Sequence, residues 1–161
     1  MKRKILLYPN PILNTISKPV VEFNEEIHSL LADMKDTLDS TSGVGLASIQ
    51  IGVPLRVLII KYEDIFMEVI NPKITRYEGS RTSLEGCLSL NGVSELVERA
   101  SYVEVKYQDR NGKVKYMSDN GMLATIIQHE MEHLNGGLYI DSLSSTKKKV
   151  LLAKYKSRKG K

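Results

Sequence analysis

The chain has 161 residues, which is enough for one domain to bury a substantial hydrophobic core. Its composition, 42% hydrophobic and 26% charged, is that of an ordinary soluble globular protein. The net charge is +4, and the single cysteine, Cys87, excludes an internal disulfide framework.

The positive charge is concentrated at the C-terminus. Eight lysines and arginines and no acidic residue lie between Thr146 and Lys161, so the rest of the chain is net −4. Such a segment is typical of either a solvated helix or an arm that binds nucleic acid.

The N-terminus resembles a signal peptide only in its first residues. Positive charges precede an apolar run, but Pro9 and Pro11 interrupt this run and no small-residue cleavage site follows. No stretch approaches the length of a transmembrane helix. With one cysteine, which fits a reducing compartment, we expect a cytoplasmic protein with no membrane partner.

In chain order, an extended or turning arm over residues 1–23 is followed by a helix. Asn24 is a good N-cap, acidic residues occupy the first turn, and apolar residues at helical spacing continue to Leu38. The next segment, 43–54, is expected to be a glycine-punctuated loop.

The middle of the chain is predicted to form β-strands, because β-rich runs of strand length recur there. Asn111-Gly112 predicts a hairpin between the last two of these runs. The runs are residues 55–61, 66–72, 101–108 and 114–117.

Two more helices are predicted after the strands. One has Ser118 or Asp119 as its N-cap and ends at Leu134, before Asn135-Gly136-Gly137. The other is basic and amphipathic and covers about 145–157. Because helices and antiparallel strands are segregated along the chain, we expect an α+β fold forming one domain over residues 1–161.

The stretch IIQHEMEH, residues 126–133, places two histidines on one face of the second of these helices. His129 and His133 are one turn apart, as two ligands of one metal ion require. Glu130 lies beside the first histidine, where its carboxylate can take a proton from water and return it to a leaving group. The motif is typical of zinc proteases.

A catalytic metal site needs a third protein ligand and one open position. Zinc proteases take that ligand from a histidine or glutamate downstream, yet neither residue type follows His133, and Asp141 is the only acid. The remaining histidine, His28, is expected to be a half-exposed residue of the first helix. A metallopeptidase is therefore the weaker alternative.

Cys87, in the stretch SLEGCLSLNG, is the candidate that remains. A lone cysteine is often an inert buried residue, but beside two histidines that lack a partner we interpret it as the third ligand. Thiolate and imidazole suit zinc and ferrous iron about equally, so composition does not choose the metal.

Hydrolysis of an acyl group also needs hydrogen-bond donors for the oxyanion. The backbone N–H of Leu88 directly follows the cysteine, and Gln50 offers a side-chain amide at the end of GVGLASIQ. Gly43 and Gly45 would let the backbone approach a ligand closely. By itself, the GxG pattern is usually only a turn.

Three motifs resemble the signature motifs of peptide deformylases in order and spacing: GVGLASIQ (43–50), EGCLS (85–89) and QHEMEHLNG (128–136). The arm LYPNPILNTISKPV (7–20) is similar to the N-terminal arm of that family, so the resemblance spans nearly the whole chain. It implies hydrolysis of N-formyl-methionyl peptides to formate and a free N-terminus. With it we expect antiparallel sheets packed around the metal-binding helix.

The resemblance also implies roles for single residues. Glu130 would be the general acid and base, while Gln50 and the Leu88 N–H would hold the formyl oxygen. The native metal would be ferrous iron, which zinc, nickel or cobalt often replaces. The implied ligands are Cys87, His129 and His133.

A methionine pocket is implied as well, formed by Val44 and Gly45 together with Met122 and Ile126. Independently of the resemblance, Met122 and Ile126 share one helix face with the two histidines, so an apolar strip leads to the metal. The alternative for both residues is plain core.

Three positions depart from the family pattern. Glu132 stands where aspartate is usual and is expected to be a surface charge or a local salt-bridge partner. Ser48 replaces a second alanine, and Leu90-Asn91-Gly92 replaces a Pro-Gly pair. The last departure leaves the peptide preference of the substrate-facing loop 90–99 open. Arg99 matches a basic position of the family and either binds the peptide or forms an exposed salt bridge.

The basic tail, 145–161, resembles the C-terminal helix by which bacterial deformylases contact the ribosome. A basic arm would bind polyanionic RNA in a salt-dependent way, and a merely solvated helix is the alternative. A catalytically silent ribosome-binding homologue is a further hypothesis, which the presence of every catalytic residue disfavours.

Overall fold

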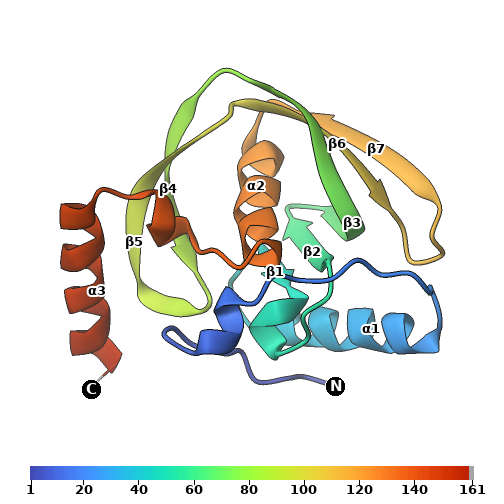
Figure 1. Cartoon of the computed structure of the whole chain (residues 1–161), viewed down its shortest axis with the longest axis horizontal. Helices are drawn as coiled ribbons and strands as arrows, with labels where there is room; N and C mark the ends of the chain where they lie inside the picture. Colours follow the sequence, from blue (N-terminus) through green and yellow to red (C-terminus); the bar gives the residue numbers. More distant parts are fainter. Residues whose placement is uncertain (160–161) are drawn as a thin grey trace.

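The structure, a computed structural model, describes residues 1–159. Within this range it contains three α-helices, seven β-strands and three short 3₁₀ turns (Figure 1). The helices are α1 (Glu25–Asp39), α2 (Met122–Leu134) and α3 (Ser145–Lys159). The strands are β1 (Gly45–Ala47), β2 (Val57–Tyr62), β3 (Ile65–Glu78), β4 (Arg81–Cys87), β5 (Leu90–Arg99), β6 (Tyr102–Gln108) and β7 (Val114–Asp119).

The strands of the described chain form two antiparallel sheets. Five of them are ordered β1-β2-β3-β6-β7, and β4 pairs with β5 in a separate hairpin. Helix α2 lies between the hairpin and the larger sheet in Figure 1, and most of its residues are buried. The predicted α+β architecture with antiparallel sheets is confirmed.

Helix α1 begins where the sequence predicts. The side chain of Asn24 accepts a hydrogen bond from the backbone N–H of Ile27, and two glutamates occupy the first turn. Its apolar face, which includes Leu31 and Met34, is fully buried against the larger sheet. The arm before it contains a 3₁₀ turn at Pro11–Asn14.

Helix α2 begins later than predicted, at Met122. Asp119 still belongs to β7, where it pairs with Val103. From this strand end its carboxylate accepts hydrogen bonds from the backbone N–H groups of Gly121 and Ala124, at 2.8 and 2.9 Å. Asp119 therefore caps the helix from two positions before its N-cap residue, Gly121.

The prediction of a loop over 43–54 is wrong for residues 45–51. Residues 45–47 form β1, in which Gly45 pairs with Ile60 and Ala47 with Leu58, and a 3₁₀ turn follows at Ser48–Ile51. The backbone N–H and C=O groups of β1 find their hydrogen-bond partners on β2, which is not adjacent in the local sequence pattern.

The segment 90–99, expected to be a loop, is strand β5, and its partner β4 was not predicted as a strand. Polar and apolar residues do not alternate cleanly in these strands, because charged Glu85 and Arg99 are buried while Leu84 and Leu96 are exposed. The predicted hairpin at Asn111-Gly112 is confirmed, since Gln108 pairs with Val114 and Gly112 has a φ of 82°.

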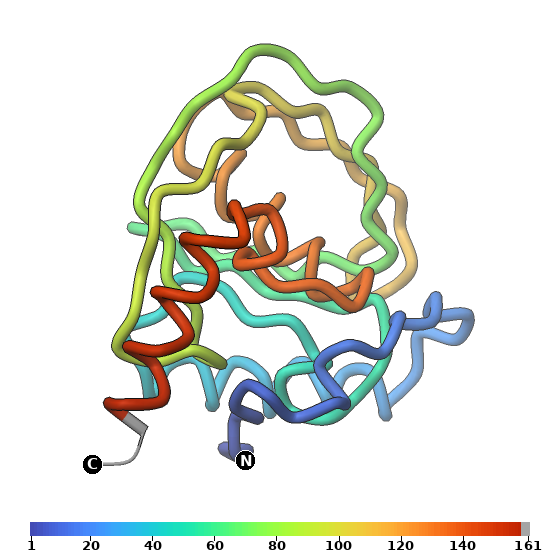
Figure 2. The backbone as a smooth tube through the Cα atoms, turned by 60° about the vertical axis from the view of Figure 1, so that its left-hand side comes forward, coloured from blue at the N-terminus to red at the C-terminus, as the bar shows by residue number. Residues whose placement is uncertain are grey.

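Helix α3 spans slightly more than the predicted 145–157 and packs on the hairpin. Leu151 and Tyr155 are buried in one cluster with Leu90 and Val97 of β5. Figure 2 shows α3 running alongside this hairpin. The last predicted residues of the basic tail, 160–161, lie outside the described part. Over residues 1–159, no helix is both long and apolar enough to cross a membrane.

Candidate active site

A cavity of about 450 Å³ opens between segments of the chain that are distant in sequence. Its walls come from β1 and the residues just before it, from β4 and the start of β5, and from α2. The lining residues are 42–45, Gln50, Tyr62, 84–88, 91–93, Met122, Thr125, Ile126, His129 and Glu130.

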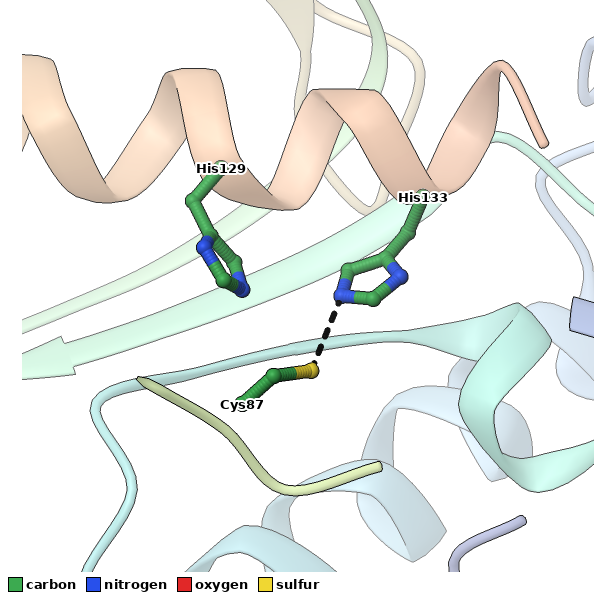
Figure 3. A group of neighbouring side chains, drawn as sticks. All are labelled: Cys87, His129 and His133. Carbon is green, nitrogen blue, oxygen red and sulfur yellow. Dashed lines mark hydrogen bonds between the residues drawn. The ribbon is translucent and has the colours of Figure 1, made fainter. Parts of the chain in front are cut away.

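The side chains of Cys87, His129 and His133 converge beside this cavity. One ligand atom from each lies within 4.8 Å of the other two. Cys87 Sγ is 3.4 Å from Nε2 of His133, the contact dashed in Figure 3, and both imidazoles project from one face of α2. The sequence prediction that these three residues share a site thus agrees with their placement.

Glu85 orients the His129 ring. Nδ1 of His129 lies 2.8 Å from Oε1 of Glu85, and this contact leaves Nε2 for the centre of the cluster. The ring of Tyr139 stacks on the other side of His129, with centroids 5.8 Å apart. The imidazole is therefore fixed by a hydrogen bond and by packing.

Arg99 holds Glu85 in turn. Its guanidinium donates two hydrogen bonds to the Glu85 carboxylate, at 2.6 and 2.8 Å, and lies 2.5 Å from Oε1 of Glu132. The side chains of Arg99 and Glu85 are 8% and 6% exposed, so this is a buried ion-pair network.

The salt bridge of Arg99 is buried, which corrects the expectation of an exposed one. Arg99 is not among the described residues that line the cavity, and its contact with the site is through Glu85. Its part in peptide binding stays a prediction. Glu132 is the local salt-bridge partner that the sequence predicts.

Hydrogen bonds and burial shift the pKa values of Glu85 and of the two histidines. Burial alone would raise the pKa of Glu85, but hydrogen bonds from His129 and Arg99 lower it below its usual range. Burial opposes charge on His129, yet hydrogen bonds to Cys87 and Glu85 raise its pKa well above the ordinary value. Burial lowers the pKa of His133 well below the ordinary value.

Glu130 lies at the base of the cavity, with its side chain 4% exposed. Its Oε1 is 3.8 Å from Nε2 of His133, and its carboxylate packs against the backbone of Gly45. Burial raises the pKa of Glu130 to about 7, although the charges of His129 and Arg99 act in the opposite direction. A carboxyl group with such a pKa can both accept and donate a proton near neutral pH.

Gln50 is fixed at both ends of its amide. Its Oε1 accepts a hydrogen bond from the backbone N–H of Ala47 at 3.0 Å. Its Nε2 is 3.1 Å from Oγ of Ser89 and 3.6 Å from Sγ of Cys87. The donor end of the amide therefore faces the cysteine, and Leu88, which lines the cavity, follows that cysteine directly.

The four expected pocket residues also line the cavity. Val44 and Met122 stand at its rim, 41% and 43% exposed, whereas Ile126 is 5% exposed and lies deeper. Gly45 lines the cavity with its backbone alone. The apolar strip on α2 thus leads from the rim to the histidines.

The donors of this cluster fit a divalent transition-metal ion. A thiol and two imidazole nitrogens within 4.8 Å of one another are the ligand types that such ions prefer. The Glu85 contact fixes the His129 tautomer.

Sequence reasoning missed Glu85, Ser89 and Tyr139 as parts of the site. Glu85 and Ser89 are in the stretch EGCLS, and their burial, 7% and 0% exposed, is unusual for polar residues. No local pattern predicts this burial, because it arises from packing of the β4–β5 hairpin on α2.

Comparisons with known proteins agree with this arrangement. A family model described as polypeptide deformylase matches residues 2–149. A peptide deformylase of Helicobacter pylori (strain P12) is 45% identical over 154 residues, which cover 91% of this chain and 88% of the relative. One from Campylobacter jejuni is 43% identical over 169 residues, covering 99% and 96%.

Solved structures give the same result. A peptide deformylase from Legionella pneumophila superimposes with a TM-score of 0.95 at 40% identity, covering 99% of this chain and 96% of that one. A peptide deformylase from Synechococcus elongatus in complex with actinonin has a TM-score of 0.90 at 35% identity, covering 95% and 85%.

Proposed function

The chain belongs to the polypeptide deformylase family, and from this premise we propose that it removes the formyl group from the N-terminal formyl-methionine of newly made proteins. Formate and a free amino group are the products. The observation that carries the proposal is the convergence of Cys87, His129 and His133 on a cavity that also contains Glu130. Such a reaction takes place where proteins are made, which favours the cytoplasm.

Cys87, His129 and His133 would hold one metal ion. We propose ferrous iron as the native ion, with zinc, nickel or cobalt able to replace it, because a thiolate and two imidazoles suit all of these. A bound divalent ion would supply Lewis acidity toward the formyl carbonyl and make water more acidic. Glu85, held by Arg99, would keep His129 in the required tautomer and orientation.

Glu130 is proposed as the group that moves the proton. Its pKa of about 7, raised by burial, lets the carboxylate accept a proton from water near neutral pH. The same carboxyl can then deliver the proton to the leaving amine. Packing against Gly45 and α2 restrains the carboxylate so that little reorganisation is needed during reaction.

Gln50 and the backbone N–H of Leu88 are proposed as donors to the formyl oxygen as it gains negative charge. The hydrogen bond from Ala47 holds Oε1 of Gln50 away from the cysteine, so its NH₂ group is oriented before substrate binds. Donors that are fixed in advance stabilise developing charge most effectively.

The cavity also supports a peptide substrate with methionine first. Ile126, Val44 and Met122 offer an apolar wall for an unbranched side chain next to the metal ligands. β1 is a terminal strand of its sheet, and β4 pairs only with β5 within residues 1–159. Two free strand edges therefore border the cavity, where an extended peptide can add hydrogen bonds.

Helix α3 is proposed to contact the ribosome. It presents lysines on a surface that is exposed, while Leu151 and Tyr155 attach it to the hairpin. Binding to ribosomal RNA through such a helix should weaken steeply with added salt. Ribosome co-sedimentation at several salt concentrations, with the lysines at 147–149 replaced by alanine, tests this contact.

The test of the activity is formate release from formyl-Met-Ala by protein prepared without oxygen, with its metal content measured. Turnover should depend on the metal and should fall by about 100-fold or more in Glu130→Ala. Lys73→Ala, on the larger sheet away from the cavity, is the matched control.

The alternatives give different results in the same experiment. A metallopeptidase would cleave internal peptide bonds without releasing formate. A silent ribosome-binding homologue would bind metal and ribosomes without turnover. Full activity in the Glu130→Ala and Cys87→Ser variants would overturn the proposed site.

A further inference from the structure

Two exposed leucines form an apolar patch on the β4–β5 hairpin, next to the mouth of the cavity. Leu84 and Leu96 pair directly across the two strands and are 66% and 49% exposed. Residues that pair across antiparallel strands have their side chains on the same face of the sheet. The patch continues the cavity, because Leu84 also lines it.

The patch lies on the outer face of the hairpin. Side chains alternate along a strand, and Glu85, the next residue, points inward to His129. Leu84 therefore points away from His129 and into solvent, and it borders only the mouth of the cavity. The next cross-strand pair on this face, Thr82 and Glu98, is polar, so the apolar surface has room for a single side chain.

The residues that line the cavity carry little exposed charge, although the Arg158 side chain packs against Gly92 at its edge and Glu98 follows the leucine pair on β5. Among its described lining residues there is no lysine, arginine or aspartate. Its two acids, Glu85 and Glu130, are only 7% and 3% exposed. Val44 and Met122, which are both apolar, stand at the same rim.

From this geometry we infer that Leu84 and Leu96 select an apolar second residue in the formyl-methionyl peptide. The inference rests on the proposed function. In an extended peptide beside β4, the first side chain points into the cavity and the second points to the outer face. The second side chain then lies against Leu84, with Leu96 behind it. The preference of this chain is thus for an aliphatic or aromatic second residue over an acidic or basic one.

The test is kcat/KM for formate release from four peptides, formyl-Met-X-Ser with X as Leu, Ala, Glu or Lys. Burying the larger side chain against the patch should favour Leu over Ala by about fivefold. Glu and Lys should both fall below Leu, because a charged side chain placed against two leucines loses hydration without gaining apolar contact.

Three variants locate the preference. Leu84→Ser and Leu96→Ser should each reduce the ratio of Leu to Ala, and Leu84→Lys should raise the Glu peptide relative to the Lys peptide. Tyr116→Ser, on β7 and 73% exposed in the wild type, is the control and should keep the wild-type ratios. All these positions are exposed, and thermal melting verifies that the variants are folded.

Two results would overturn the inference: equal kcat/KM for the Leu and Ala peptides in the wild type, or an unchanged ratio in Leu84→Ser and Leu84→Lys. Failure of the proposed function looks different, since none of the four peptides would then release formate.

Discussion

The sharpest prediction concerns Gly45, whose missing side chain leaves room for Glu130. A methyl group at this position would lie 2.6 Å from Oε2 of Glu130 and 2.9 Å from its Cγ and Cδ. Non-bonded heavy atoms are comfortable at about 3.5 Å or more. Gly45→Ala therefore displaces the carboxylate by about 1 Å.

A displacement of about 1 Å in a catalytic group typically costs about 100-fold in rate, equivalent to about 2.7 kcal/mol of transition-state stabilisation. The backbone of Gly45 does not have a positive φ, so alanine fits its conformation. We expect kcat/KM for formyl-Met-Ala to fall by about this factor. The thermal midpoint should change by only a few degrees.

Gly137→Ala is the matched control, because a methyl group there would meet its nearest atoms at 3.5 Å, an ordinary contact. The steric explanation is tested further by Glu130→Ala, which removes Cγ and the carboxylate and with them the overlap. The double variant Gly45→Ala/Glu130→Ala should be no slower than Glu130→Ala alone. The reasoning would be refuted if Gly45→Ala kept wild-type activity, or if the rate loss of the double variant equalled the product of the losses of the two single variants.

Three further predictions concern stability. Arg99→Ala leaves Glu85 and Glu132 without their cation and should lower the free energy of unfolding by about 3–5 kcal/mol in urea titrations; a loss under about 1 kcal/mol would contradict the buried network. Backbone N–H groups of its own hairpin lower the pKa of Asp109 below its ordinary value of 3.8. The wild type should therefore be more stable than Asp109→Asn above pH 3.8, and this advantage should vanish as the pH falls through the folded pKa of Asp109. The free energies of unfolding of both proteins, measured at about pH 7 and about pH 2, check this prediction. The Tyr139 hydroxyl is buried without a hydrogen-bond partner among the described residues, so Tyr139→Phe should leave the thermal midpoint unchanged or raise it.

Local signals were sufficient for much of the fold. The N-cap at Asn24, the hairpin at Asn111-Gly112 and the histidine spacing on α2 each depend on residues a few positions apart. The sequence also indicated that Cys87 joins the histidines, because no other ligand remained. Its placement within 4.8 Å of both agrees with that argument.

The elements that could not be predicted depend on distant partners. The segment 43–54 contains β1 only because β2 pairs with it, and 90–99 is a strand only because β4 lies beside it. Glu85 and His129 are 44 positions apart. From sequence alone a charged residue such as Arg99 is expected on the surface, and only the fold places it between two carboxylates.

The three motifs support one another in space. Gly45 from the first gives Glu130 of the third its position, and Glu85 from the second orients His129 of the third. Gln50 from the first reaches Cys87 of the second. Each motif therefore provides a contact that a reacting group in another motif requires. The arrangement depends on β1 and β4 lying along α2, and the strand edges that deliver these residues are the same edges that border the cavity. The strands that build the site are therefore also the strands whose free edges we propose to receive the peptide.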